Sequence, residues 1–325
     1  MASLLRFSLR RFAWSVPVVL LASFLLFWAV RATFDPVAKL RQGRDAGAVQ
    51  REIERLGLDR SVPEQYLLWM KGFVTGDWGT STRTGGSVSS LIGQALWPTV
   101  QLMFWGVLLA AFVALAIGVY TAVRQYSAGD YVLSTLAYVG ISLPAFWFGL
   151  MLIQVLAVWP VQSLGWSEPP FYFVGLHTPG QSGFNLDYLR HLALPLATLT
   201  VTLTASWSRF ARTAMLDTLS SDYVRTARAK GVPPLAVVMR HALRNALAPF
   251  VTIVALDTGV LFGGLIVTEQ IYSIPGMGRL FLQSLQAGDV FVLVPWMFVV
   301  ALAVVFFNLL ADVSYALLDP KVKLR

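Results

Sequence analysis

The stretch FAWSVPVVLLASFLLFWAV, residues 12–30, holds 19 consecutive residues without a charge. At 1.5 Å per residue, a helix of this length crosses the hydrocarbon core of a bilayer, which is about 30 Å thick. Arg6, Arg10 and Arg11 precede the stretch, as in a secretory signal peptide. However, the run exceeds the roughly 7–15 apolar residues of a signal sequence, and no A-x-A cleavage site follows. We therefore predict that residues 12–30 form the first transmembrane helix.

The composition of the whole chain favours a membrane protein. Of 325 residues, 56% are hydrophobic and 13% are charged, and the mean hydropathy is +0.65. Soluble domains carry about 25% charged residues, because their surface is hydrated. The net charge of +8 does not indicate a nucleic-acid-binding patch, since the basic residues flank apolar runs. We expect contact with the lipid bilayer and none with nucleic acid.

Long apolar runs predict an all-α polytopic membrane protein with six transmembrane helices, because backbone groups in lipid must be paired within their own segment. The expected spans are 12–30, 97–122, 132–159, 190–210, 246–271 and 291–315. Threonine and serine alternate with other residues between 198 and 208, as in a barrel strand. The other spans are too apolar and unbroken for a β-barrel.

The basic residues predict that both termini are cytoplasmic. With this orientation the inside segments hold most of them, whereas the two later outside loops hold only Arg190 and Arg279. The chain then divides into a cytoplasmic N-terminus with the first helix (1–30), an outside segment (31–96) and a five-helix core (97–325). The core includes a cytoplasmic loop at 213–245.

The outside segment has the pattern of a small module. Apolar residues spaced by three and four predict an amphipathic helix over 46–58, which Gly57 would end. Pro63 is expected to open another short helix through Trp69. Two interpretations stay open: a cap packed on the membrane face, or contact with a partner that delivers substrate.

The chain lacks the residue sets of a metal centre or a nucleophilic enzyme. It has no cysteine, which excludes disulfides, thiolate ligands and a cysteine nucleophile, and its three histidines are scattered. The stretch GQSG at 180–183 matches the G-x-S-G pattern of rhomboid-like serine proteases, but Ser182 lies in a polar loop. We predict no metal site, no catalytic residue and no enzymatic activity.

The cytoplasmic stretch SSDYVRTARAKGVPP, residues 220–234, predicts a short capped helix followed by a second helix. Ser221 suits the N-cap, and Asp222 lies in the first turn, where the helix dipole favours an anion. Basic residues occupy the last turn and Gly231 suits a left-handed C-cap. Composition alone leaves open whether this is an ordinary basic loop that orients the chain.

The order of residues in this stretch resembles the loop E-A-A-x3-G-x9-I-x-L-P in the membrane subunits of bacterial ABC importers. Only Ala227, Gly231 and Leu243 keep the general pattern. The departures, YVRTARAKG followed by RHALRNAL, resemble the dipeptide/oligopeptide/nickel permeases, in which the loop forms a coupling helix that docks on the ATP-hydrolysing subunit. The resemblance implies that the ATPase-coupling residues are Asp222, Tyr223, Arg225, Thr226, Ala227, Arg228, Lys230 and Gly231.

Other stretches carry the same resemblance from the first span to the C-terminus. They are GLDR at 57–60, GDWGTS at 76–81, SIPGMGRL at 273–280, NLLAD at 308–312 and LLDPK at 317–321. The first two resemble the outside segment of the B-type subunit. The resemblance implies the type I ABC importer permease fold in a bacterial inner membrane. It also implies a second homologous permease, two cytoplasmic ATP-binding subunits and an extracytoplasmic substrate-binding protein as partners.

The driving force is expected to come from those partners. None of the five lysines follows a glycine, so the chain lacks the G-K-[ST] of a Walker A loop. We expect no cofactor in this chain, and ATP and Mg in the ATP-binding subunits, which would drive alternating access. Peptide is the favoured cargo, with dipeptide, longer peptide, nickel chelate and haem left open. The alternative is a stand-alone, ion-coupled carrier or channel, although no clear paired interrupted helices are present.

Charged groups at membrane depth are costly and indicate function. We predict that one face of the fifth span lines the translocation path, formed by Asp257, Leu261, Gly264 and Thr268, with Glu269 near its outer end. The alternative for Asp257 is a hydrogen bond to a donor on a neighbouring helix. Gly259 and Gly263 form a G-x-x-x-G motif, which predicts close helix packing.

Overall fold

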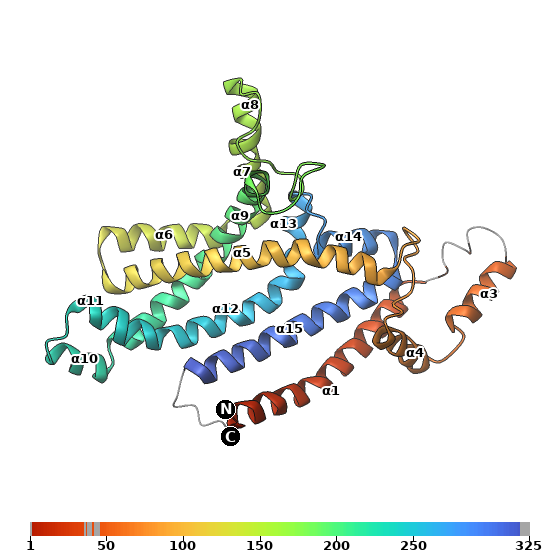
Figure 1. Ribbon diagram of the computed structural model, residues 1–325, viewed down its shortest axis with the longest axis horizontal. Coiled ribbons are helices and arrows are strands. Elements are labelled where there is room, and N and C mark those ends of the chain that lie inside the picture. Colours follow the sequence, from red (N-terminus) through yellow and green to blue (C-terminus); the bar gives the residue numbers. More distant parts are fainter. Residues whose placement is uncertain (1, 36, 38–40, 42–45, 319–325) are drawn as a thin grey trace.

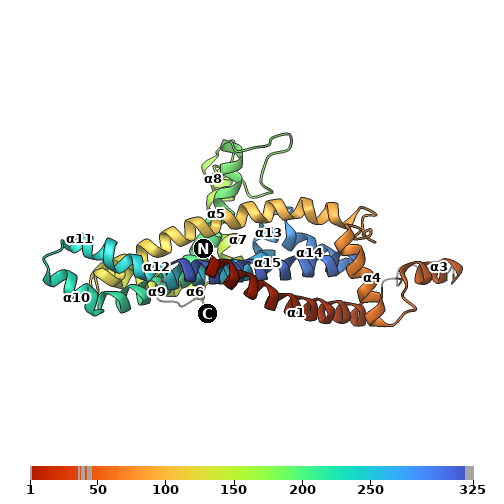
Figure 2. The same cartoon turned by 60° about the horizontal axis from the view of Figure 1, so that its bottom comes forward.

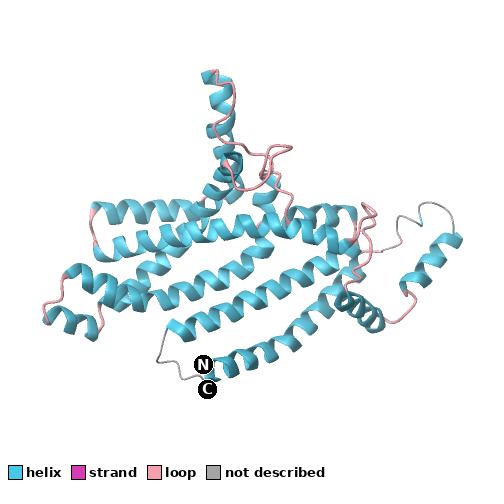
Figure 3. Cartoon of the chain, viewed as in Figure 1, coloured by secondary structure: helices cyan, strands magenta, loops and turns pink. Residues whose placement is uncertain are grey.

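A computed structural model of the chain describes residues 2–35, 37, 41 and 46–318, and within them every regular element is a helix. Five long helices lie side by side in an elongated slab (Figures 1 and 3). They are α1 (Ala2–Thr33), α5 (Val88–Val123), α9 (Leu186–Leu219), α12 (Arg244–Gly264) and α15 (Val290–Leu318). The shorter ones are α3 (Ala46–Leu56), α4 (Val62–Thr75), α6 (Ala128–Ser142), α7 (Ala145–Ile153), α8 (Trp159–Leu164), α10 (Asp222–Ala229), α11 (Pro234–Ala236), α13 (Ile266–Ile271) and α14 (Met277–Ala287).

Five helical segments are long and apolar enough to cross a membrane, which confirms the polytopic all-α prediction. They are Leu9–Thr33, Val88–Val123, Ala145–Leu164, Pro234–Gly263 and Val290–Leu317. The predicted span 190–210 lies inside α9, a helix of 34 residues whose hydroxyl side chains lower its hydropathy. Several of these hydroxyl groups are buried against neighbouring helices, among them Thr198, Thr204 and Ser208.

The third span differs from the prediction of one helix over 132–159. The helix breaks at Leu143, whose ψ of 124° is extended, because the following Pro144 disfavours helical backbone before it. Beyond the break, α7 continues through a π-helix, η1 (Gln154–Val158), into α8. This arm, residues 145–164, projects away from the slab in both views (Figures 1 and 2).

Small residues allow α5 and α9 to pack closely along much of their length. A Cβ atom on Gly118 would lie 2.4 Å from the Cβ of Ala211 and 2.8 Å from the backbone nitrogen of Arg212. Ala110 and Ala114 are fully buried in the same contact. Without a hydrophobic driving force between helices in lipid, such close backbone approach is what holds two helices together.

The predicted G-x-x-x-G packing is confirmed between α12 and α15. A Cβ atom on Gly259 would lie 3.2 Å from the Cβ of Phe307, and one on Gly263 would lie 3.2 Å from Cγ1 of Val300. At one end of the slab, Arg11 of α1 forms an ion pair of 3.2 Å with Asp312 of α15. The start of α1 and the end of α15 therefore lie at the same end of the molecule (Figure 1).

The outside segment contains the two expected helices. Gly57 follows α3 with a φ of +63°, which ends the helix, while α4 continues beyond the expected Trp69 to a left-handed Gly76. Tyr66 and Trp69 of α4 pack against aromatic rings of α1 and α15. This packing supports the interpretation of the segment as a cap.

The contact at Gly118 can be tested with alanine. Gly118→Ala places a methyl group against the backbone of α9, so we expect the free energy of unfolding to fall by about 1–3 kcal/mol and the melting temperature of the purified protein to fall with it. Gly93→Ala is the matched control, because a Cβ there meets nothing within 4 Å. Equal melting temperatures for the two variants would contradict the packing argument.

Candidate coupling site and translocation path

The short helix predicted within residues 220–234 is present as α10, which begins at Asp222 and ends at Ala229, with Lys230 as its C-cap. Ser221 occupies the N-cap with extended backbone, but its hydroxyl donates to the carbonyl of Thr218 at 2.5 Å rather than accepting from the first turn. Gly231 adopts a φ of +77°, and the next residue, Val232, returns a hydrogen bond to the carbonyl of Ala227. The left-handed end of the helix is therefore confirmed, whereas the Ser221 side-chain cap is not formed.

Helix α10 has an apolar base and a polar outer face. Val224 and Ala227 are buried and pack on Val237 of the π-helix η2 (Val237–Leu243), which leads into α12. Seven of the eight predicted coupling residues are exposed: Asp222, Tyr223, Arg225, Thr226, Arg228, Lys230 and Gly231. Ala227 instead attaches the helix to its base. Val224 and Ala227 are apolar and three residues apart, which is the sequence signal for the buried face of α10.

An ion pair that the sequence analysis missed fastens the end of the bundle beside α10. Asp130, at the start of α6, is buried and receives both terminal nitrogens of Arg212 from α9. The backbone N–H of Tyr126 donates to the same carboxylate at 2.9 Å. The hydrogen bonds and charge of Arg212 lower the pKa of the Asp130 carboxyl below its ordinary value. The loop before α6 is thus tied to α9, the helix that precedes α10.

Asp257 lies in α12, where it was expected, and has a partner on a neighbouring helix. The indole nitrogen of Trp207, a fully buried residue of α9, donates to its carboxylate at 2.7 Å. This is the hydrogen bond that was considered as the alternative to a place in the path. Asp257 is only partly buried, however, so its carboxylate has both a structural contact and an exposed side.

The expected single face of the fifth span is interrupted. Helix α12 ends at Gly264, and Leu265, with a ψ of 1°, separates it from α13. Leu261 is partly buried on α12, but Thr268 is buried on α13 and is not on a continuous helix with Asp257. The prediction of one uninterrupted helix over 246–271 was therefore wrong, because paired glycines with their low helix propensity precede the break.

Glu269 is fully buried, with its carboxylate surrounded by the turn that precedes α14. The hydroxyl of Thr99 on α5 donates to it at 2.5 Å, and the backbone N–H of Arg279 donates at 3.1 Å. The Thr99 oxygen also accepts from the backbone N–H of Met277 at 2.8 Å. A Cβ atom on Gly276 would lie 2.3 Å from the carboxylate, which explains the glycine. Glu269 therefore fixes the turn over 273–280, and its place along the path stays a prediction.

Two family models match this chain. Residues 114–324 match the binding-protein-dependent transport system inner membrane component, and residues 4–96 match the N-terminal part of such a membrane component. The chain is a member of this family. It is accordingly a multi-pass inner-membrane permease and not an enzyme, so the protease and stand-alone carrier alternatives are dropped.

Several relatives match nearly the whole chain. It is 38% identical over 318 residues to the oligopeptide transport system permease protein AppB of Bacillus subtilis, covering 97% of this chain and 98% of that protein. It is 34% identical to the dipeptide transport system permease protein DppB of Alkalihalophilus pseudofirmus, covering 98% and 100%. The glutathione transport system permease protein GsiC of Pectobacterium atrosepticum is 35% identical, covering 99% and 100%.

A solved structure shares the fold. An inward-facing MetNI methionine ABC transporter superposes with a TM-score of 0.55 at 17% identity, covering 70% of this chain and 96% of that one. The permease fold of an ABC importer, expected from the sequence, is thereby confirmed.

The Asp130–Arg212 pair predicts a pH-dependent stability. Because the folded pKa of Asp130 is depressed, its contribution is present above the unfolded pKa of about 3.9 and is lost as the pH falls through the folded value. Asp130→Asn should lower the free energy of unfolding at neutral pH by about 1–3 kcal/mol and remove this acid-dependent loss.

Melting temperatures of the purified protein between neutral pH and about pH 3 check this prediction. The control is Asp222→Asn, because the Asp222 side chain is 97% exposed. A variant at position 130 with the melting temperature and acid profile of the unaltered protein would show that the ion pair does not stabilise the fold.

Proposed function

We propose that this permease is one of two membrane-spanning subunits of an ATP-driven importer for short peptides. The names of its full-length relatives carry the words oligopeptide, dipeptide and glutathione, and glutathione is itself a short peptide. Dipeptides and somewhat longer peptides are thus favoured over a nickel chelate or haem. The observation that carries the proposal is α10, a polar helix displayed at one end of the slab on a buried apolar base (Figure 1).

The end that carries α10 is proposed to be cytoplasmic, together with both termini. The start of α1 and the end of α15 lie at this end, joined by Arg11 and Asp312. This orientation also places most basic residues on the inside. Two ATP-binding subunits would then hold ATP and Mg in the cytoplasm, one docked on α10 and the other on the second permease.

Two sets of contacts could transmit a movement of α10 to the rest of the helix bundle. Val224 and Ala227 contact Val237, which belongs to the same helical run as α12. The Asp130–Arg212 ion pair joins α9 to the start of α6. ATP shifts the transporter between inward-open and outward-open states only if it binds one of them more tightly. We propose that rigid contacts of this kind transmit that preference to the path.

The second permease subunit is proposed to cover the arm formed by residues 145–164. The arm leaves the slab with large apolar side chains exposed, among them Phe146, Trp147, Val155 and Trp159. Gln154 is also exposed on it, and its side-chain amide makes no hydrogen bond within the described part of the chain. A polar amide in an apolar helix favours a protein partner over lipid, since hydrocarbon offers it no hydrogen bond.

The opposite end of the slab is proposed to meet the extracytoplasmic binding protein. The outside segment with α3 and α4 lies there (Figure 1). Between the two ends, Asp257 and Leu261 stay candidates for the path, because both are partly exposed in the isolated chain. Their exposed sides would face the second permease across a central cavity.

The docking of α10 can be tested by cross-linking, because the chain contains no cysteine. Tyr223→Cys places a thiol on the exposed face, and we expect a disulfide or short cross-link to a co-expressed ATP-binding subunit. Ser182→Cys, in an exposed loop before α9, is the control and should give none. Cross-linking at both positions or at neither would contradict the proposal.

A charge reversal tests coupling without changing the fold. Arg225 forms a single described ion pair, an exposed one with Asp222 at 3.5 Å, so Arg225→Glu should cost less than about 1 kcal/mol of stability. We expect it to reduce peptide-stimulated ATP hydrolysis and labelled-peptide uptake by about tenfold. Unchanged uptake by the reconstituted transporter would remove Arg225 from the docking surface.

A further inference from the structure

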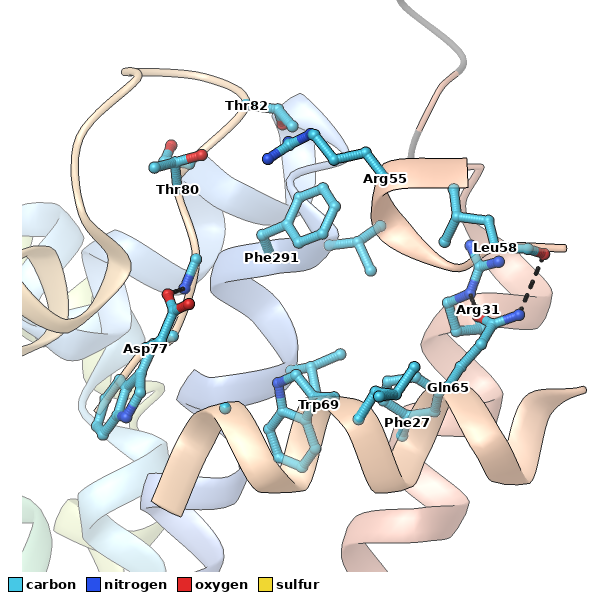
Figure 4. A pocket seen from close by; sticks show the side chains of 17 residues that line it. Phe27, Arg31, Arg55, Leu58, Gln65, Trp69, Asp77, Thr80, Thr82 and Phe291 are labelled. Atoms are coloured by element: carbon cyan, nitrogen blue, oxygen red, sulfur yellow. Dashed lines mark hydrogen bonds between the residues drawn. The ribbon is translucent and has the colours of Figure 1, made fainter. Parts of the chain in front are cut away.

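A pocket of about 470 Å³ opens between the outside segment and the outer ends of α1 and α15 (Figure 4). Its volume lies within the range of roughly 300–1,000 Å³ that small-molecule sites occupy. The pocket is walled by Phe27 and Arg31 of α1, by Gln65 and Trp69 of α4, and by Phe291 of α15. Neither the coupling site nor the candidate path includes any of these residues.

Two arginines border this pocket. Arg31 donates through Nε to the side-chain oxygen of Gln65 at 2.9 Å. Gln65 is 7% exposed and is itself fixed, because its amide donates to the carbonyls of Leu58 and Arg60. No hydrogen bond or ion pair within the described chain uses the two terminal nitrogens of Arg31. Arg55 extends over Phe291 from the end of α3, so a second guanidinium borders the same space (Figure 4).

A carboxylate lies across the pocket from Arg31 (Figure 4). Asp77 lies in the turn after α4, and its carboxylate accepts one hydrogen bond, from the backbone N–H of Gly79 at 3.2 Å. The residue is exposed at the rim, as is Arg55, so solutes reach both ends of the pocket from the outside solution. Positive and negative side chains around one pocket suit a ligand that is itself a zwitterion.

Aromatic rings form the apolar part of the pocket between these charges. Trp69 lies at its floor, held edge-on to Phe298 with ring centroids 5.7 Å apart and tilted against Phe27 at 5.9 Å. Its indole N–H has no acceptor among the described residues. The rigid floor therefore offers an apolar surface together with a donor, which is the composition of sites that bind small amphipathic molecules.

We infer that this pocket binds a zwitterionic small molecule with an apolar portion: an anionic carboxylate or phosphate at Arg31 and Arg55, and a primary ammonium at Asp77. Charge-assisted hydrogen bonds to guanidinium groups are the strong contacts for such anions. Two sources present this chemistry on the outer side of the membrane: a short peptide with free termini, and the headgroup of phosphatidylethanolamine. The inference does not depend on how α10 couples to ATP hydrolysis.

The test measures binding of a labelled Phe-containing dipeptide to the purified full chain in nanodiscs. We expect saturable binding that weakens about tenfold in Asp77→Asn and in Arg55→Gln. Acetylation of the peptide amine should weaken binding to the unaltered chain as much as Asp77→Asn does. Acetylation should not weaken binding to the Asp77→Asn variant any further. Amidation of the peptide carboxylate should weaken binding to the unaltered chain as much as Arg55→Gln does, and should not weaken binding to that variant further.

Matched controls and a lipid arm complete the experiment. Asp59→Asn and Arg60→Gln alter exposed charges of the same segment outside the pocket and should leave binding unchanged. The lipid arm counts phosphatidylethanolamine retained by the detergent-purified chain in native mass spectrometry. Retention that falls in Arg55→Gln and Asp77→Asn, with no dipeptide binding, assigns the site to the lipid.

The inference is overturned if neither ligand binds. It is also overturned if the control variants weaken binding as much as the pocket variants do. Melting temperatures of all variants separate loss of the site from loss of the fold. A negative result here does not bear on the cross-linking of α10. The ligand pocket and the docking of α10 can therefore be rejected independently of each other.

Discussion

The close contact between α5 and α9 is the constraint on which the rest of the molecule depends. Lipid gives two apolar helices little reason to associate, so their backbones must approach closely enough for dense contact. Gly118 and Ala211 make that approach possible, and Ala110 and Ala114 continue it toward the other end. The same pair of helices carries the polar anchors at both ends of the slab: Thr99 belongs to α5, and Arg212 belongs to α9.

Each end of the slab is closed by a buried carboxylate that accepts from another element. Glu269 fixes the turn before α14 through backbone N–H groups and Thr99. Asp289, just before α15, is fully buried and accepts from the hydroxyl of Ser81 at 2.5 Å, which holds the outside segment on the core. At the α10 end, Asp130 accepts from Arg212 and so joins α6 to α9. A buried carboxyl group that lost these hydrogen-bond donors would carry a desolvation cost, so the contacts favour discrete positions of the elements they join.

Much of this arrangement could be predicted from the sequence. The apolar runs indicated the helices, and Gly231 indicated the end of α10. Breaks within helices were harder to predict. Pro195 and Pro249 lie inside intact helices, whereas Pro144 follows a break. Local signals do not distinguish these prolines, since the outcome depends on what packs around them.

Side-chain partners were beyond sequence reasoning. Asp257 and Glu269 both read as polar residues at membrane depth, yet one is partly exposed beside Trp207 and the other is enclosed by a turn. Their partners lie 50 and 170 residues away along the chain. Such pairings follow from the crossing of helices, which a single sequence does not reveal.

The uninterrupted run from Pro234 to Gly263 has a mechanical consequence. At 1.5 Å per residue its 30 residues form a rod about 45 Å long, with the base of α10 at one end and Leu265 just beyond the other. Gly259 and Gly263, near its far end, lie against α15 without room for a side chain. A pivot at this position would divide the rod into a long limb on the α10 side and a short limb on the other side, so a large displacement at Val237 would become a small one beside the turn that Glu269 holds.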